Sequence, residues 1–320
     1  MKIQLTIAMS SLACAVVGPV LAADDYPSRP IRIVYPYPAG GVSDLTHFVA
    51  DKLAQRFRQP VVIETRPGAS GSIGAEVVAR AQPDGYTLIA TPPPPLAINQ
   101  SLFPKLAYVP AAFVPVTVIA TMPNLLVANR QLPVSDVREL LAYAKAHPDR
   151  LSYASTGNGG TPHLTAEHFK GAGGVNIVHV PYQGISSAMP DLASGRVDIM
   201  FANLTAVQSM VAAGKLKVLA VASGERLPEL PAVPTLQEAL PGFVSEAWLA
   251  LAAPPGTPQP IIDKLAAAVR EVLQGPEAIE RFRQFGANPI GNTPLQAKNF
   301  IREEAERWAE VIRASGIRPE

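Results

Sequence analysis

The chain has 320 residues, of which 27 are lysine or arginine and 26 are aspartate or glutamate, so its formal net charge is +1. This balance, with no basic cluster, argues against nucleic acid or an anionic membrane surface as a partner. Hydrophobic residues make up 48% of the chain and charged residues 17%, which is typical of a globular protein, and the length suffices for two domains.

Residues 1–23 have the pattern of a secretory signal peptide. Lys2 supplies a positive charge, residues 3–17 are mostly apolar, and small residues offer a cleavage point after Ala22 or Ala23. The apolar run is shorter than the roughly 20 residues that a membrane span needs. We therefore expect a secreted protein.

The single cysteine, Cys14, lies inside this predicted signal peptide. It could instead carry a lipid anchor, but Ser11 stands where a lipid-attachment motif usually has leucine. After cleavage the chain has no disulfide, no thiolate nucleophile and no cysteine to ligate a metal.

Two strand-like runs end in glycine turns that open helices. Residues 31–35 lead into the turn at residues 38–41, and residues 151–154 lead into residues 155–160, with Thr161 as the expected N-cap. Such turns leave backbone N–H groups and the positive end of a helix dipole facing one point, where an anion can bind. Either turn could also be purely structural. Neither turn matches a nucleotide-binding fingerprint, so a small carboxylate is favoured as the anion.

Strands and helices alternate along the rest of the chain. Ser135 is the expected cap of one helix, another runs from Thr257 to Leu273, and a capping box at Thr293 opens the last, in which Trp308 is expected to be a core residue. This alternation predicts parallel sheets with helices on both faces. Further strands are expected at residues 60–64, 86–90, 125–128, 176–180, 197–201, 218–222 and 248–252.

Several short motifs occur in a fixed order along the chain. They are residues 31–34 with 38–41 and Asp44, residues 66–69 with Gly74, residues 83–88, residues 179–182 with Gly184, residues 219–221 and residues 231–235. In this order they resemble the Bug family, the periplasmic substrate-binding proteins of tripartite tricarboxylate transporters. The resemblance covers essentially the whole chain after the signal peptide.

The resemblance implies an α/β fold with two domains that close like a clam-shell, of the type II-like periplasmic-binding-protein class. Each domain is expected to be a mostly parallel sheet flanked by helices. The matching boundaries are 24–127 and 247–320 for the first domain and 128–246 for the second. The strands expected at residues 125–128 and 248–252 suit a pair of hinge crossings between these domains.

The resemblance also implies that backbone groups and ordered water at the two glycine turns hold a ligand carboxylate. Carried over position by position, it places ligand contacts at Tyr37, Ala39, Gly40, Ser43 and Thr91 in the first domain, and at Ser155, Thr156, Gly157, Thr161, His163, Tyr182, Ala202 and Asn203 in the second.

Some of these residues have plainer alternatives. Asp44 could cap its helix, Tyr37 could pack against the other domain, and His163 could bond its own turn. Arg66 could attract an acid or form a salt bridge with a neighbouring carboxylate.

An enzyme is the rival class. Ser70 and Ser155 stand beside glycines, but neither lies in a Gly-x-Ser-x-Gly motif, and the sequence places no Asp/His pair to activate them. His168 and His179 lack metal-ligand spacing. We therefore expect no catalysis, no metal and no cofactor.

The function implied is that of a monomeric solute-binding protein that captures a small organic acid and delivers it to membrane transporter subunits. A sensory partner that presents its ligand-bound form to a histidine kinase would share the same fold and cleft. A secreted hydrolase is the least favoured alternative.

Ala202 departs from the family pattern, because many relatives carry aspartate between the equivalents of Phe201 and Asn203. An aspartate there could pair with a ligand ammonium, whereas alanine cannot. A desolvated, unpaired ammonium costs several kcal/mol. We therefore expect a carboxylate with a neutral or aromatic remainder in preference to an amino acid.

Overall fold

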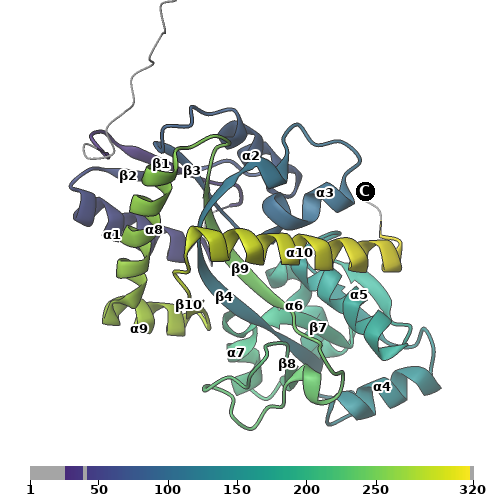
Figure 1. Ribbon diagram of the computed structural model, residues 1–320. Helices are drawn as coiled ribbons and strands as arrows, with labels where there is room; N and C mark the ends of the chain where they lie inside the picture. The colour runs from purple at the N-terminus through teal and green to yellow at the C-terminus, as the bar shows by residue number, and fades with distance from the viewer. Residues whose placement is uncertain (1–25, 39–41, 318–320) are drawn as a thin grey trace, which may run out of the picture.

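The computed structural model describes residues 26–38 and 42–317. The predicted signal peptide, Cys14, and the turn residues Ala39 and Gly40 lie outside the described residues. Two sheets share one strand, β4 (Val114–Asn129), and helices cover both (Figure 1). Within the described ranges, no helix combines the length and the apolar character that crossing a bilayer requires.

The upper half of the molecule is built on residues 114–123 of β4 and five further strands, of which the two-residue β10 (Asn288–Pro289) pairs with β4 alone. β2 (Val61–Thr65), β1 (Ile31–Tyr35) and β3 (Thr87–Thr91) are parallel, and β9 (Glu246–Ala253) runs antiparallel between β3 and β4. One buried cluster joins the sheet to α1 (Ser43–Phe57) and α8 (Gln259–Gln274), and a second joins it to α2 (Ser72–Ala79) and α10 (Pro294–Ser315).

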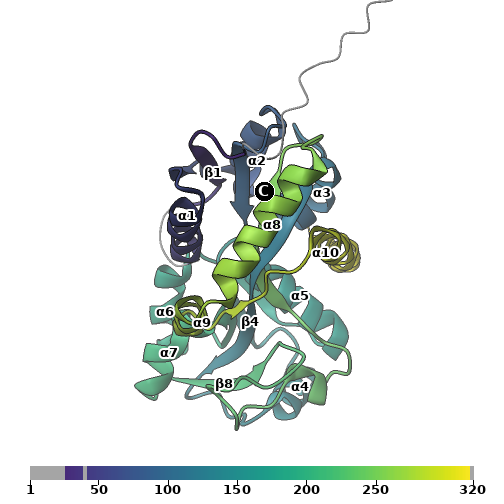
Figure 2. The same cartoon turned by 60° about the vertical axis from the view of Figure 1, so that its left-hand side comes forward.

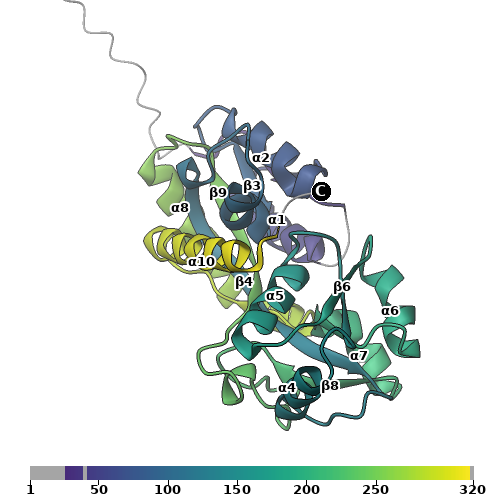
Figure 3. The same ribbon diagram turned by 90° about the vertical axis from the view of Figure 1, so that its right-hand side faces the viewer.

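The lower half is built on residues 124–129 of β4. β7 (Ile199–Asn203) and β8 (Leu216–Val221) pair with this end of β4 in antiparallel fashion, while β5 (Ser152–Ser155) pairs in parallel with β7 and with β6 (Val178–Pro181). Its helices are α4 (Val137–Ala146), α5 (Thr161–Gly173), α6 (Ile185–Ser194) and α7 (Leu204–Ala212) (Figure 3). The other elements are η2 (Ala69–Gly71), η3 (Pro94–Ile98), α3 (Asn99–Leu102), η4 (Pro110–Ala112), η5 (Leu236–Glu238), α9 (Pro276–Gln284) and β10 (Asn288–Pro289).

The two-lobed α/β architecture expected from the sequence is therefore present, but each sheet is mixed. Only β1–β3 and β5–β7 form parallel groups, because β4 and β9 run antiparallel to their neighbours. The strand expected at residues 125–128 is the last third of a 16-residue strand. Its first part pairs with β9 and its end with β7 and β8, so one continuous strand carries the chain from the upper half into the lower half.

The helix starts were predicted with mixed success. The capping box at Thr293 and the full burial of Trp308 are confirmed. The cap of α4 is Asp136 instead of Ser135, because the Asp136 side chain accepts the Glu139 N–H at 2.8 Å. The cap of α5 is Gly160 instead of Thr161, which is the first helical residue.

Candidate functional site

A cleft of about 560 Å³ lies between the upper and lower halves. The helices α1, α6 and α7, which begin at this cleft, lie on one side of β4 in Figure 2. Residues from both halves line it: Tyr37, Val42, Pro92, Pro94, Met122, Asn124, Thr156, Gly160, Thr161, Pro162, Ile185, Ala202, Asn203, Thr205, Ala206, Ala247 and Phe285.

None of the side chains in this described lining carries a charge. Its polar groups are the tyrosine and threonine hydroxyls and the amides of Asn124 and Asn203, and the rest of the wall is apolar. An anion in this cleft would therefore meet neutral donors and no fixed countercharge among these residues.

Four helices begin at the cleft wall. Val42 directly precedes α1, Thr161 opens α5, Ile185 opens α6, and Asn203 precedes α7, and all four residues line the cleft. None of the four helices has a hydrogen bond from a capping side chain at its N-terminus. α2, α8 and α9 also lack one, so the missing cap alone does not mark a site. Four positive dipole ends around one neutral cavity make it a favourable place for an anion.

The predicted contacts of the upper half occupy different positions relative to the cleft. The Tyr37 ring lines it, while its hydroxyl donates to the Ser70 carbonyl at 3.1 Å, and burial raises the Tyr37 pKa so that this hydroxyl stays protonated. Ser43 and Thr91 are buried behind the wall, and the Thr91 hydroxyl donates to the Pro92 carbonyl.

Of the predicted contacts in the lower half, Thr156, Thr161, Ala202 and Asn203 line the cleft. Tyr182 does not, and its hydroxyl donates to Asp191 Oδ2 at 2.9 Å. Ser155, Gly157 and His163 are not among the lining residues, and Ser155 and His163 are buried.

These three residues form hydrogen bonds that stabilise the turn at residues 155–160. The Gly157 N–H donates to Ser155 Oγ at 3.2 Å, and the Gly159 N–H donates to His163 Nδ1 at 3.0 Å. These two N–H groups are therefore occupied within the turn and are not among the unpaired N–H groups that the sequence predicted there. The plainer alternative for His163, a bond to its own turn, is confirmed.

An aromatic stack supports the same turn. The His163 ring stacks on His179 at 4.0 Å between centroids, and His179 stacks on Tyr153 at 4.8 Å. The Tyr153 hydroxyl donates to Glu167 Oε1 at 2.6 Å. Burial lowers the pKa of His163 to about 4, so the ring is neutral near pH 7 and Nδ1 is free to accept the Gly159 N–H.

The plainer alternative for Arg66 is confirmed, because it forms a salt bridge with Glu64 away from the cleft lining. Asp44 does not cap α1: it lies in the first turn, and the N-cap residue Val42 makes no side-chain cap bond. No group of histidine, cysteine, aspartate or glutamate side chains within the described residues could hold a metal ion.

Sequence reasoning missed a pairing and several lining residues. Ser155 Oγ lies 2.6 Å from His179 Nε2, a serine and histidine contact that the sequence did not indicate, but Ser155 is fully buried and does not line the cleft. Among the lining residues, Asn124, Ala247 and Phe285 were also missed. Asn124 could have been noticed as an amide inside a long apolar run.

The chain matches known proteins over most of its length. A family model for the tripartite tricarboxylate transporter family receptor, TctC, matches residues 45–317. The chain belongs to this receptor family. Protein BugT of Bordetella pertussis is 37% identical to it over 311 residues, which cover 96% of this chain and 95% of BugT. The Bug resemblance drawn from the motifs is therefore confirmed.

Solved structures of this receptor family have the same fold. R. palustris Rpa4515 with adipate superposes with a TM-score of 0.81 at 38% identity, covering 92% of this chain and all of that one. MatC from Rhodopseudomonas palustris with bound malate superposes with a TM-score of 0.76 at 35% identity, covering 90% of this chain and all of MatC. The chain is thus a solute-binding receptor of the TctC type.

Proposed function

We propose that this receptor captures a small organic carboxylate in the cleft and delivers it to the membrane subunits of a tripartite tricarboxylate transporter. The observation that carries this proposal is the convergence of the N-termini of α1, α5, α6 and α7 on a cleft whose described lining has no charged side chain. Adipate and malate in the two structural relatives are dicarboxylates, which supports the same ligand class.

The proposed ligand contacts fall into two groups. Tyr37, Thr156, Thr161 and Asn203 would contact the ligand, with Ala39 and Gly40 of the first turn retained from the family resemblance. Ser155, Gly157 and His163 would position the second turn, as their bonds behind the wall support. Ser43, Thr91 and Tyr182 would act only through the elements that they brace.

We also propose that the two domains divide at residues 127 and 246, and that the protein is exported to the periplasm after removal of residues 1–23. Strand pairing supports crossings close to these positions, because β4 leaves its β9 partner after Pro123 and the chain returns to β9 after Ser245. These two crossings would serve as the hinge of a monomeric clam-shell.

Ala202 sets the expected selectivity. It is almost fully buried at the end of β7, and neither it nor any other described lining residue offers a carboxylate to an ammonium group. We therefore expect aliphatic or aromatic acids to bind more tightly than amino acids of the same carbon skeleton, by roughly three decades in affinity.

Calorimetric titration of the purified protein tests the proposed ligand class and the selectivity argued from Ala202. The panel is adipate, malate, succinate and glutarate, with aspartate and glutamate as the aminated analogues of the last two. Binding of at least one acid, with the aminated analogue weaker, is expected. Tighter binding of glutamate than of glutarate would refute the argument from Ala202, and the absence of binding by every carboxylate would refute the ligand class.

A further inference from the structure

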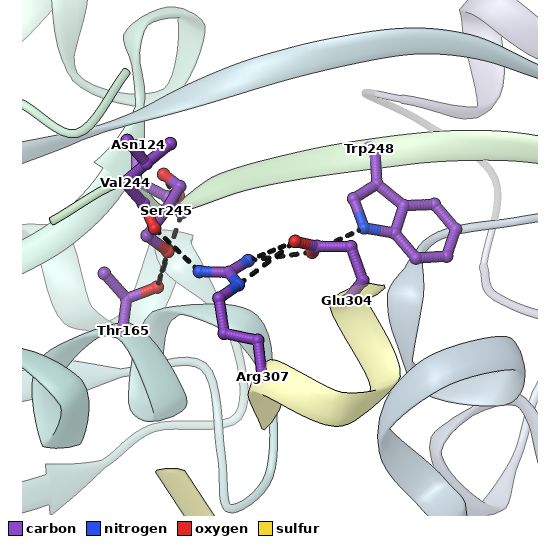
Figure 4. A network of polar contacts seen from close by, with 7 residues as sticks. All are labelled: Asn124, Thr165, Val244, Ser245, Trp248, Glu304 and Arg307. Atoms are coloured by element: carbon purple, nitrogen blue, oxygen red, sulfur yellow. Dashed lines mark hydrogen bonds and ion pairs between the residues drawn. The ribbon is translucent and has the colours of Figure 1, made fainter. Parts of the chain in front are cut away.

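Asn124 is a buried amide in the wall of the cleft, on the strand that both sheets share. The residue is only 1% exposed. Its Nδ2 donates to the Ser245 carbonyl at 3.3 Å and to Thr165 Oγ1 at 3.5 Å (Figure 4). Its Oδ1 has no hydrogen-bond partner within the described residues. Asn124 therefore brings an unused acceptor to the wall of the cleft.

The orientation of this amide is set by its neighbours. If the amide were turned over, Oδ1 would face the Ser245 carbonyl oxygen, and two acceptors would meet with no hydrogen between them. Both bonds of Nδ2 are longer than the usual value of about 2.9 to 3.0 Å for an N–H donor to oxygen. The amide is therefore held in one orientation but has room to shift toward a better partner.

A buried oxygen without a donor is uncommon in proteins, because no bond offsets the cost of removing it from water. A ligand group that donates a hydrogen bond would supply the missing bond. A carboxylate oxygen can only accept, so Asn124 Oδ1 repels it. Asn124 therefore favours a donor on the ligand, whereas the helix N-termini around the cleft favour a negative charge.

Asn203 supplies a second amide beside the first. It stands directly opposite Asn124 in the pairing of β4 with β7, and it also lines the cleft. Side chains of directly opposite residues project from the same face of a sheet, with Cβ atoms about 5 Å apart. The Asn203 side chain does not cap α7, so its Nδ2 can donate to a group in the cleft. An acceptor and a donor side by side match a hydroxyl, which both donates and accepts.

We propose that Asn124 makes this receptor selective for hydroxycarboxylates. The ligand hydroxyl donates to Asn124 Oδ1 and accepts from Asn203 Nδ2, while a carboxylate of the same ligand lies at the helix N-termini. The inference rests on the proposed function for the carboxylate and adds the hydroxyl. An ammonium in place of the hydroxyl would still lack a countercharge among the described lining residues, so the expected preference for acids over amino acids is unchanged.

Three four-carbon diacids test the hydroxyl in the parent protein. Malate carries the hydroxyl, succinate lacks it, and fluorosuccinate carries a fluorine that is close to a hydroxyl in size but cannot donate. Each enantiomer of malate and of fluorosuccinate is titrated by calorimetry at pH 7.5. One enantiomer of malate is expected to have a dissociation constant about 10-fold or more below that of succinate, with fluorosuccinate close to succinate.

Asn124→Leu tests the residue, because leucine keeps a similar volume and offers no acceptor. The ratio of the succinate and malate dissociation constants is expected to fall to about one, with little change for succinate. Asn99 is the matched control, since its Nδ2 also donates twice, to the Ser70 carbonyl and to Ser72 Oγ, and its buried Oδ1 also lacks a partner. Asn99 lies outside the cleft lining, so Asn99→Leu should keep the ratio of the parent.

The outcomes separate this inference from the proposed function. If succinate and malate bind the parent equally, or if Asn124→Leu keeps the preference for malate, the role of Asn124 is overturned while the carboxylate ligand class stands. Fluorosuccinate that binds as tightly as malate overturns it too, because fluorine cannot donate to Oδ1. If Asn124→Leu fails to fold, Asn124→Ser, whose side chain is too short to reach the hydroxyl, takes its place. A parent that binds no carboxylate refutes the proposed function, and this inference with it.

Discussion

The helices that begin at the ligand cleft differ from α4 and α10, which begin with a capping side chain, in how the N–H groups of the first turn are satisfied. At the start of α10, Thr293 accepts the Gln296 N–H and Gln296 accepts the Thr293 N–H, so the first-turn donors are satisfied internally. At the start of α5 and α7, Gly160 and Asn203 make no such bond. The difference teaches that α4 and α10 satisfy first-turn donors with their own side chains, whereas the helices at the cleft have no side-chain cap, and neither do α2, α8 and α9, whose first residues do not line it.

Adding a negative charge at the cleft is expected to give the largest effect. Asn203→Asp keeps a good N-cap residue for α7 but places a carboxylate among the donors that would hold the ligand. Affinity for adipate is expected to fall about 100-fold or more, measured by calorimetry, with stability unchanged. Thr293→Asp makes a similar change at the capped α10 and should leave affinity unaltered. Equal adipate affinity in Asn203→Asp and Thr293→Asp would show that the start of α7 does not differ from the start of α10 in its effect on the ligand.

Removing the bond from Arg307 in α10 to the Val244 carbonyl (Figure 4) is expected to give the next largest effect, a loss of stability. Arg307→Met leaves the Val244 carbonyl without its donor and Glu304 without its partner, in a half-buried setting. The free energy of unfolding is expected to fall by about 2 to 3 kcal/mol, measured by urea denaturation. Arg313→Met, at an exposed position on the same helix, is the matched control. An equal loss of unfolding free energy in Arg313→Met would show that the bonds of Arg307 to Val244 and Glu304 do not stabilise the protein.

The neutral His163 predicts a pH dependence. Its pKa is about 4 in the folded protein and near 6.5 when unfolded, so the unfolded state binds more protons between these values. The contribution of neutral His163 to the free energy of unfolding is therefore complete above pH 6.5 and is lost as the pH falls toward 4. Parent protein is expected to lose about 2 kcal/mol more than His163→Gln between pH 7 and pH 4. Both proteins keep His179, so parallel curves would show that His163 does not titrate as its burial indicates.

The smallest effect is expected at the α10 cap. Thr293→Ala removes the side-chain acceptor of the Gln296 N–H and should lower the free energy of unfolding by about 1 kcal/mol, with adipate affinity unchanged. Denaturation and titration of one preparation measure both. A change in affinity would mean that the start of α10 communicates with the cleft.

Much of this architecture could be predicted from the sequence because it rests on local signals. Alternating strands and helices, the Thr293 capping box and the buried stripe of Trp308 depend on residues close together in the chain. The 16-residue length of β4 could not be predicted in this way. Its pairing with β9 and β7 comes from distant segments, and Pro115 and Pro123 within it read as strand breakers.

The site was predicted to a similar degree. The turn at residues 155–161 was placed correctly beside the cleft, since a glycine turn before a helix is a local signal. Which N–H groups of this turn remain available to a ligand could not be predicted. The Gly159 N–H donates to His163 Nδ1, and the His163 ring is held by stacking on His179, which comes from another strand. Asn124 and Ala247 enter the wall only through the crossing of β4 and β9.

The shared strand β4 has a consequence for how the protein melts. Its first part is paired with β9 and its end with β7 and β8, so neither sheet can come apart without fraying a strand that the other sheet also uses. Two lobes joined by flexible linkers would unfold as independent units, whereas lobes that share a buried strand lose their hydrogen-bond ladders together. Calorimetry of this receptor should therefore show one transition whose van't Hoff and calorimetric enthalpies agree, despite its two-lobed shape.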